Sequence, residues 1–227
     1  MKAVIFDLDD TLILERDFVF SGYRAVAKYL EAGRGLSAER IYGILKEEFE
    51  SSAQNVFNRM YDRLGTGYSE EDIKSLVRVY REHEPDISLC GDVLPALEEL
   101  GGSGCRLGVL TDGYLVTQKN KAKALELDKY FEAIVYTDEL GREYWKPSIK
   151  GFELLSGKLG IPLSSFVYVG DNPKKDFEIM KNSPVKTVRI VREGGVYSEA
   201  PYGGECRENK RIGSLTELKG ILEELLL

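Results

Sequence analysis

Residues 1–13 read MKAVIFDLDDTLI and join an apolar run directly to a cluster of acidic residues. The apolar part, Val4 to Phe6, is typical of a strand that is buried on both faces of a parallel sheet. Asp7, Asp9 and Asp10 follow within four residues. Two unit charges about 4 Å apart repel by about 4 kcal/mol at an effective dielectric constant of about 20. The stretch therefore raises the question of what offsets this repulsion in the folded chain.

The composition is that of an ordinary soluble globular protein. Of the 227 residues, 43% are hydrophobic and 30% charged, and the formal net charge is −7. This charge argues against a nucleic-acid or membrane-surface binder, because both of these partners present negative surfaces. No apolar run is long enough for a membrane-spanning helix and no signal-peptide pattern is present, so we expect a cytoplasmic protein. The one histidine argues against a multi-histidine zinc site, and three cysteines without a CxxC pair indicate reduced thiols.

Short apolar runs alternate with segments of helical spacing along most of the chain. We expect strands at residues 4–6, 107–110, 133–136, 166–169 and 185–191. Between them, apolar residues recur at the three- and four-residue spacing of a helix. This alternation predicts an α/β fold with a Rossmann-like, doubly wound parallel sheet. The last helix has a clear start, because Ser214 and Glu217 have the spacing of a capping box.

Residues 15–88 interrupt this alternation with helical patterns alone. Three apolar stripes occur there, at residues 19–30, 41–57 and 73–80, and glycine-containing turns separate them. We therefore expect an α/β core made of residues 1–14 and 89–227, with an all-helical domain of residues 15–88 inserted between the first two strands.

Polar residues follow the strands at the edge of the sheet where ligands bind in this fold class. They are Asp7, Asp9, Asp10 and Thr11; Thr111 and Asp112; Lys146; and Asp171 with Asp176. Such groups suit phosphoryl transfer through an aspartyl phosphate, in which a carboxylate splits one hydrolysis into two easier steps. Mg²⁺ prefers oxygen ligands, which Asp7 and Asp171 could supply, and a lysine would lower the repulsion between the carboxylate and the phosphate.

In their order, spacing and strand context these residues resemble the motifs of the haloacid dehalogenase superfamily over essentially the whole chain. The superfamily has an Asp-x-Asp-x-Thr motif, a Ser or Thr after an apolar strand, a Lys that is often followed by Pro, and an acidic pair after a strand. The matching residues are Asp7, Asp9 and Thr11; Thr111; Lys146; and Asp171 with Asp176. In this family the first strand lies between the second and the fourth, which would bring Asp7 beside Thr111 and Asp171.

The resemblance implies a role for each matching residue. Asp7 would be the nucleophile and a metal ligand. Asp9 would protonate the leaving oxygen and then activate water, while its backbone carbonyl binds the metal. Thr111, Lys146 and backbone N–H groups such as that of Asp112 would hold the phosphate oxygens.

The remaining acidic residues would serve the metal. Asp171 would bind Mg²⁺, and Asp176 would either bind it through water or orient Lys146. The implied cofactor is therefore Mg²⁺, and the implied partner is a small phosphorylated metabolite. Asp10 lies between motif positions, and we expect it to be solvated or to bind backbone groups.

The place of the insertion favours one branch of the family. Asp7 and Thr111 are 104 positions apart, whereas Thr111 and Lys146 are only 35 apart. Only the first interval can hold a cap domain. A helical cap there is similar to that of phosphoglycolate phosphatase, phosphonatase and β-phosphoglucomutase, and we expect a Mg²⁺-dependent phosphatase.

Other functions have weaker support. Dehalogenases lack the second aspartate of the first motif, and phosphonatase needs a cap lysine, for which Lys28 is a weak candidate. A phosphomutase shares Asp7 and Asp9 and stays open. A non-catalytic binding protein would have lost one of these residues. A phosphate-sensing receiver domain would carry its aspartate after an interior strand and would have no helical insertion.

Overall fold

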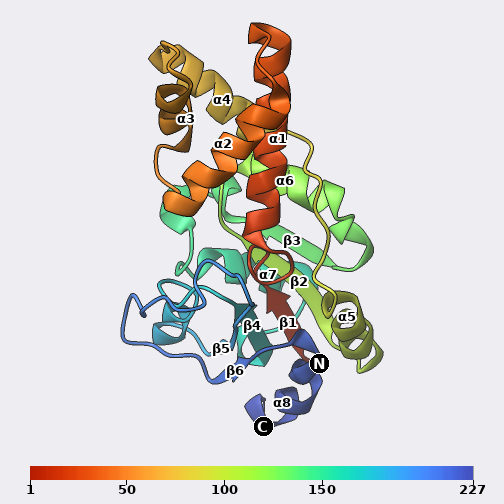
Figure 1. The fold of residues 1–227 in the computed structure, drawn as a ribbon. Helices are drawn as coiled ribbons and strands as arrows, with labels where there is room; N and C mark the ends of the chain where they lie inside the picture. Colours follow the sequence, from red (N-terminus) through yellow and green to blue (C-terminus); the bar gives the residue numbers. More distant parts are fainter. Residues whose placement is uncertain (227) are drawn as a thin grey trace. The chain divides into compact units, whose positions relative to one another are not determined.

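The computed structural model describes residues 1–226 and divides the chain into two compact units. The first unit contains residues 1–16 and the chain from residue 87 onward, and the second contains residues 17–86. Helix α1 (Glu15–Arg34) begins in the first unit and continues into the second (Figure 1). Across residues 1–226, no helix combines the length and apolar character that crossing a membrane requires.

A parallel sheet of six strands forms the centre of the first unit. Its order is β3-β2-β1-β4-β5-β6, and every neighbouring pair is parallel. The strands are β1 (Ala3–Phe6), β2 (Arg106–Thr111), β3 (Ala133–Tyr136), β4 (Phe166–Gly170), β5 (Lys186–Ile190) and β6 (Lys210–Ile212). The first five lie where the apolar runs predicted them. The edge strand β6 was not expected, because it has three residues and only Ile212 among them is buried.

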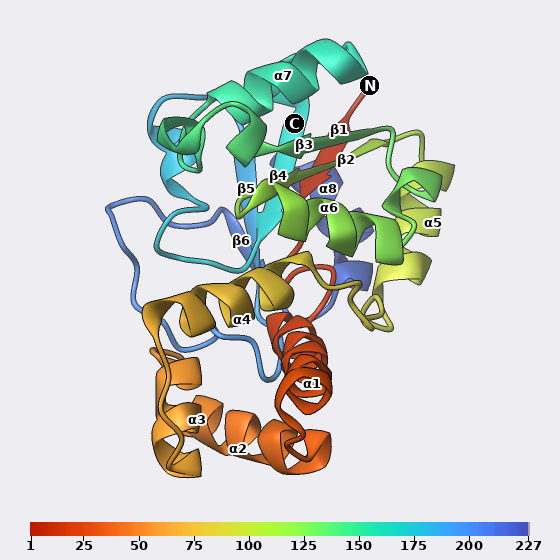
Figure 2. The same cartoon turned by 90° about the horizontal axis from the view of Figure 1, so that it is seen from above.

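Helices cover both faces of this sheet, as Figure 2 shows, which confirms the doubly wound α/β fold. On one face, α5 (Val93–Gly102), α6 (Leu115–Ala124) and α8 (Leu218–Leu225) pack against Val4 and Phe6. On the other face, α7 (Lys150–Leu159) packs against Ala3 and Ile5. The strands read as continuous apolar runs because alternate side chains enter two different cores.

Short 3-10 helices complete the first unit. They are η1 (Leu127–Lys129), η2 (Thr137–Glu139), η3 (Arg142–Tyr144), η4 (Leu163–Ser165), η5 (Glu178–Lys181) and η6 (Leu215–Glu217). The predicted capping box of Ser214 and Glu217 is confirmed, and it starts η6, which leads directly into α8.

The second unit contains most of α1 together with α2 (Ala38–Ser51), α3 (Val56–Leu64) and α4 (Glu70–Glu82), which share a core of their own. The apolar stripe of residues 41–57 is therefore two helices rather than one. The guanidinium of Arg59 binds the segment between them. It donates to the backbone carbonyl of Glu48, in the last turn of α2, and to those of Ser52 and Gln54, which follow α2.

Candidate active site

The central position of β1 brings three of the predicted site residues to one edge of the sheet. Phe6 is in register with Val109 on β2 and with Val169 on β4. Asp7 follows Phe6, and its backbone N–H donates to the Val169 carbonyl at 2.8 Å. Thr111 ends β2 and Asp171 directly follows β4, so both residues flank Asp7.

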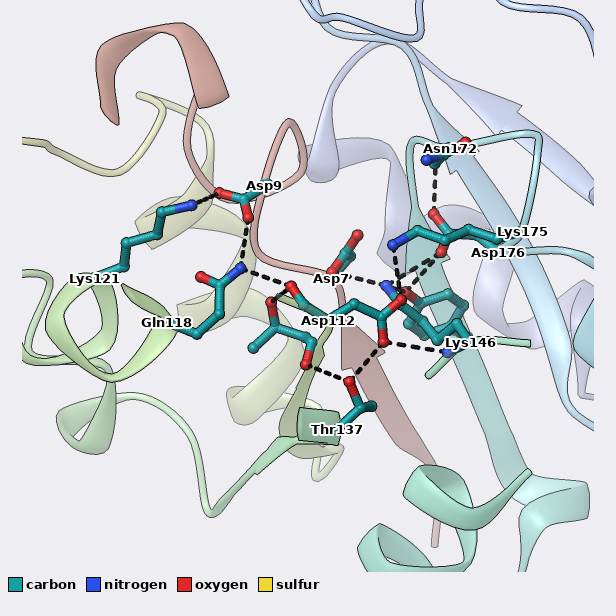
Figure 3. A network of polar contacts seen from close by, with 12 residues as sticks. Asp7, Asp9, Asp112, Gln118, Lys121, Thr137, Lys146, Asn172, Lys175 and Asp176 are labelled. Atoms are coloured by element: carbon teal, nitrogen blue, oxygen red, sulfur yellow. Dashed lines mark hydrogen bonds and ion pairs between the residues drawn. The ribbon is translucent and has the colours of Figure 1, made fainter. Parts of the chain in front are cut away.

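Lys146 lies among acidic side chains at this edge. Its ammonium is 2.9 Å from a carboxylate oxygen of Asp7, 3.2 Å from Asp176 and 2.7 Å from the Tyr168 hydroxyl (Figure 3). Burial alone would lower the pKa of Lys146, but the charges of Asp176 and Asp7 hold this pKa well above its usual range. Lys146 is therefore a fixed positive charge beside Asp7.

Asp7, Asp171 and Asp176 form a buried carboxylate cluster. One oxygen from each lies within 4.8 Å of the others. Burial and the charges of Asp176 and Asp7 raise the pKa of Asp171 to about 9. Burial likewise raises the pKa of Asp7 to about 6, although Lys146 acts in the opposite direction. Burial and mutual repulsion thus disfavour the ionised carboxylates despite Lys146, and three hard oxygen donors at this spacing fit a divalent cation.

Asp176 is held in place by the loop that follows β4. Its carboxylate accepts a hydrogen bond from the backbone N–H of Asn172 at 2.9 Å and one from the Tyr168 hydroxyl at 3.3 Å. A Cβ atom at Gly170 would lie 2.5 Å from an oxygen of Asp176, so this position requires glycine. Asp176 is therefore placed both to contact Lys146 and to contribute an oxygen to the carboxylate cluster.

The Asp112 carboxylate organises the segment that carries Lys146. It accepts hydrogen bonds from the Thr137 hydroxyl at 2.7 Å, the Lys146 backbone N–H at 3.2 Å and the Lys175 ammonium at 2.7 Å. Burial would raise the pKa of Asp112, but Lys146 and Lys175 hold it below its usual range. Thr111, which precedes it, is 1% exposed and donates only a long hydrogen bond, of 3.4 Å, to the Asp112 carbonyl.

Asp9 points away from Asp7 and toward helix α6 (Figure 3). The Lys121 ammonium lies 2.6 Å from Oδ1 of Asp9, and the Gln118 amide donates to Oδ2 at 2.8 Å. Burial would raise the pKa of Asp9, but Lys121 and Gln118 hold it below its usual range. The motif spacing did not reveal either of these α6 residues. The available signal was their i, i+3 spacing at core-facing positions of the first helix after Thr111.

Asp10 binds backbone groups, which is one of its two expected environments, and it is not solvated. It is 2% exposed and has a positive φ of 48°. Its carboxylate accepts hydrogen bonds from the backbone N–H groups of Glu15, at 2.9 Å, and Val196, at 2.7 Å. Because Glu15 is the first residue of α1, Asp10 binds one of the N–H groups that a helix leaves unpaired at its start.

Comparison with known proteins agrees with this geometry. Residues 4–190 match the family described as haloacid dehalogenase-like hydrolase. A glyceraldehyde 3-phosphate phosphatase of Methanopyrus kandleri is 31% identical, covering 99% of this chain and 98% of its own. The N-acylneuraminate-9-phosphatase of Homo sapiens is 26% identical, and the match covers 99% of this chain and 95% of the human protein. The crystal structure of a phosphatase of this superfamily from Thermococcus onnurineus, 25% identical, has a TM-score of 0.62 and covers 98% of both chains.

This chain therefore belongs to the haloacid dehalogenase-like hydrolase family. It is an enzyme of the family's phosphatase type, as the relatives over its full length are. The resemblance that the sequence motifs indicated is confirmed, and so is the enzyme class.

Proposed function

We propose that this protein is a Mg²⁺-dependent phosphomonoesterase that hydrolyses a small phosphorylated metabolite through an aspartyl phosphate, an acyl phosphate, on Asp7. The observation that carries the proposal is the position of Asp7. Its carboxylate lies beside the Lys146 ammonium on one side and within the cluster of Asp171 and Asp176 on the other. A carboxylate nucleophile, a fixed cation and a set of oxygen ligands thus meet at the carboxyl edge of a parallel sheet.

In the first step of the proposed reaction, a carboxylate oxygen of Asp7 attacks the phosphorus of the substrate. The new O–P bond forms as the ester P–O bond breaks, and Asp9, which must enter this step protonated, transfers its proton to the departing oxygen. In the second step, water attacks the phosphorus and Asp9 takes one of its protons. The Asp7–phosphate bond breaks, which releases inorganic phosphate and restores the carboxylate of Asp7.

The other groups of the site bind the phosphate and balance its charge. Lys146 would neutralise charge on the phosphate oxygens, while Thr111 and the backbone N–H groups near Asp112 would hold those oxygens in place. Asp7, Asp171 and the backbone carbonyl of Asp9 would hold Mg²⁺. When bound, this ion supplies positive charge that lowers the repulsion between a carboxylate and a phosphate of like charge.

The substrate class that we propose is the phosphate ester of a small sugar or a similar metabolite. The Methanopyrus kandleri relative is a glyceraldehyde 3-phosphate phosphatase, and the human relative is an N-acylneuraminate-9-phosphatase. Their names share a phosphate monoester on a polar carbon skeleton, while the skeletons differ in size. Glyceraldehyde 3-phosphate is the first compound to test, because its phosphatase is the more similar relative.

The test is release of inorganic phosphate from a panel of esters, measured with Mg²⁺ and again with excess chelator. The panel contains glyceraldehyde 3-phosphate, phosphoglycolate, hexose phosphates and nucleoside monophosphates. The proposal expects Mg²⁺-dependent release that is fastest from a small sugar phosphate. Equal release with chelator, or no release from any ester, would overturn it. Isomerisation of a hexose phosphate without phosphate release would instead identify a phosphomutase.

A further inference from the structure

We propose that Gln118 and Lys121 are positioning residues for Asp9 and hold its carboxylate where the leaving group of the substrate departs. The inference rests on the proposed function, in which Asp9 protonates the departing oxygen. The motifs that identify the family leave both residues unassigned, and both lie on α6, one helical turn apart.

The contacts determine both the position and the rotation of the Asp9 carboxylate. Lys121 binds Oδ1 at 2.6 Å and Gln118 binds Oδ2 at 2.8 Å, so each oxygen has its own donor. The Gln118 amide nitrogen also donates to the Asp112 backbone carbonyl at 2.7 Å. This second bond links the amide to the segment that follows β2, and the carboxylate is therefore held from two directions.

Burial indicates that this arrangement is built into the fold. Gln118 and Lys121 are each 3% exposed, although lysine is one of the residues that proteins rarely bury unpaired. Gly113 leaves room for the Gln118 amide, because a Cβ atom at Gly113 would lie 2.7 Å from the amide nitrogen. The φ of Gly113 is 130°, a value that other residues rarely adopt. Glycine at position 113 thus permits both this backbone conformation and the close approach of the Gln118 side chain.

The two α6 residues also keep the two aspartates of the first motif apart in function. Asp7 is paired with Lys146, and Asp9 is paired with Lys121. If Asp9 turned toward Lys146 instead, it would compete with the nucleophile for the same ammonium. The structure thus assigns a separate cation to each carboxylate, so that each can act on its own side of one phosphorus.

The consequence is a dependence on the leaving group. p-Nitrophenolate is a good leaving group and departs readily without a proton. Phenolate is a poorer leaving group and depends more strongly on protonation as it departs. A misplaced Asp9 should therefore slow hydrolysis of phenyl phosphate far more than hydrolysis of p-nitrophenyl phosphate. Loss of stability alone would lower the activity toward both esters by the same factor.

The experiment measures kcat/KM for phenyl phosphate and p-nitrophenyl phosphate in wild type, Lys121→Met, Gln118→Met and Asp9→Asn. We expect Lys121→Met to lower kcat/KM by about 100-fold for phenyl phosphate and by less than about tenfold for p-nitrophenyl phosphate. Gln118→Met should also lower kcat/KM for both esters, by smaller factors than Lys121→Met does. The matched control is Lys123→Met, on an exposed position of the same helix, which should keep wild-type values for both esters.

A double variant tests whether Lys121 acts through Asp9. Once Asp9→Asn has removed the proton donor, adding Lys121→Met should have little further effect on phenyl phosphate hydrolysis. An undiminished effect in the double variant, or equal losses for both esters in the single variants, would overturn the proposal. Circular dichroism monitors the folded state of the variants. If both Lys121→Met and Gln118→Met fail to fold, the two residues serve stability, and the proposal is overturned as well.

These measurements distinguish failure of the positioning role from failure of the proposed phosphatase reaction. If wild type hydrolyses neither ester, or if Asp9→Asn shows no leaving-group dependence, the proposed function or its proton donor fails. If Asp9→Asn shows that dependence and the Lys121 and Gln118 variants do not, only the positioning role fails.

Discussion

The Lys146 ammonium and the Asp7 carboxylate lie 2.9 Å apart. This ion pair is one of three separate interactions that offset the repulsion among the carboxylates after β1. Asp9 pairs with Lys121, and Asp10 accepts hydrogen bonds from two backbone N–H groups. The three neighbouring carboxylates thus point to three different partners. Their mutual repulsion is offset locally, although Asp7 still shares its surroundings with Asp171 and Asp176.

Gly170→Ala should destabilise the protein and lower its activity. The added Cβ atom would lie 2.5 Å from an Asp176 oxygen, so the carboxylate that contacts Lys146 would have to move. We expect a loss of about 1–3 kcal/mol in the free energy of unfolding, which urea denaturation measures.

Gly157→Ala is the matched control for that substitution. Gly157 lies within α7, and among residues 1–226 no atom beyond its chain neighbours and the nearby backbone of its own helix lies within 4 Å of the position that its Cβ would occupy. Because alanine is favoured over glycine in a helix, this variant should gain up to about 1 kcal/mol. A Gly170→Ala protein that is as stable and as active as wild type would contradict the tight packing described for Asp176.

Mg²⁺ should raise the melting temperature of the wild-type protein. A ligand at about 100 times its dissociation constant stabilises the state that binds it by about 2.7 kcal/mol. Asp171→Asn should remove this shift, because one of the proposed ligands is lost. The same variant should melt at a higher temperature than wild type without metal, since burial and the charges of Asp176 and Asp7 disfavour the ionised form of Asp171, whereas asparagine carries no charge to lose on folding. Differential scanning calorimetry with Mg²⁺ and with chelator measures both effects, and an equal Mg²⁺ shift in both proteins would refute the site.

Asp92→Asn should destabilise the protein in a pH-dependent way. Asp92 accepts hydrogen bonds from the Leu215 backbone N–H and from Arg192, which also donates to the Thr11 carbonyl. Burial would raise the pKa of Asp92, but the Leu215 N–H and Arg192 hold it below its usual range. A lowered folded-state pKa means that the ion pair stabilises the fold above about pH 4 and that this contribution is lost as the pH falls through the folded pKa.

The measurement for Asp92 is the urea midpoint of wild type and Asp92→Asn across this range. We expect the variant to be less stable by about 1 kcal/mol at about pH 7 and the difference to shrink toward about pH 3. Asp128→Asn, at an exposed position, is the control and should show little difference at either pH. A constant difference between wild type and Asp92→Asn would show that the Asp92 charge has no part in stability.

Periodicity predicted the parts of the fold that depend on local pattern. The five buried strands and the capping box of Ser214 were visible because each has a signal within a few residues. Strand β6 was not, since three residues with one buried side chain carry too little periodicity. The break between α2 and α3 carries contacts from Arg59 to the Glu48 and Ser52 carbonyls, which the apolar periodicity does not reveal.

The site shows the same limit. The family resemblance, with its strand order, predicted that Asp7 would lie beside Thr111 and Asp171, because parallel strands align their carboxyl ends. It did not reveal which cation each carboxylate would take. The pairing of Asp9 with Lys121 depends on the rotation of α6 about its axis, and the pairing of Asp112 with Lys175 joins residues 63 positions apart in the sequence.

Capture of the phosphorylated enzyme tests directly whether Asp7 is the nucleophile. Wild-type protein is mixed with Mg²⁺ and p-nitrophenyl phosphate, quenched in acid and digested, and its peptides are analysed by mass spectrometry, with Asp7→Asn treated in parallel. We expect one added phosphate on the Asp7 side chain in wild type, no modified peptide in Asp7→Asn, and no turnover by that variant. Phosphate on another residue, or unchanged turnover by Asp7→Asn, would contradict this role of Asp7.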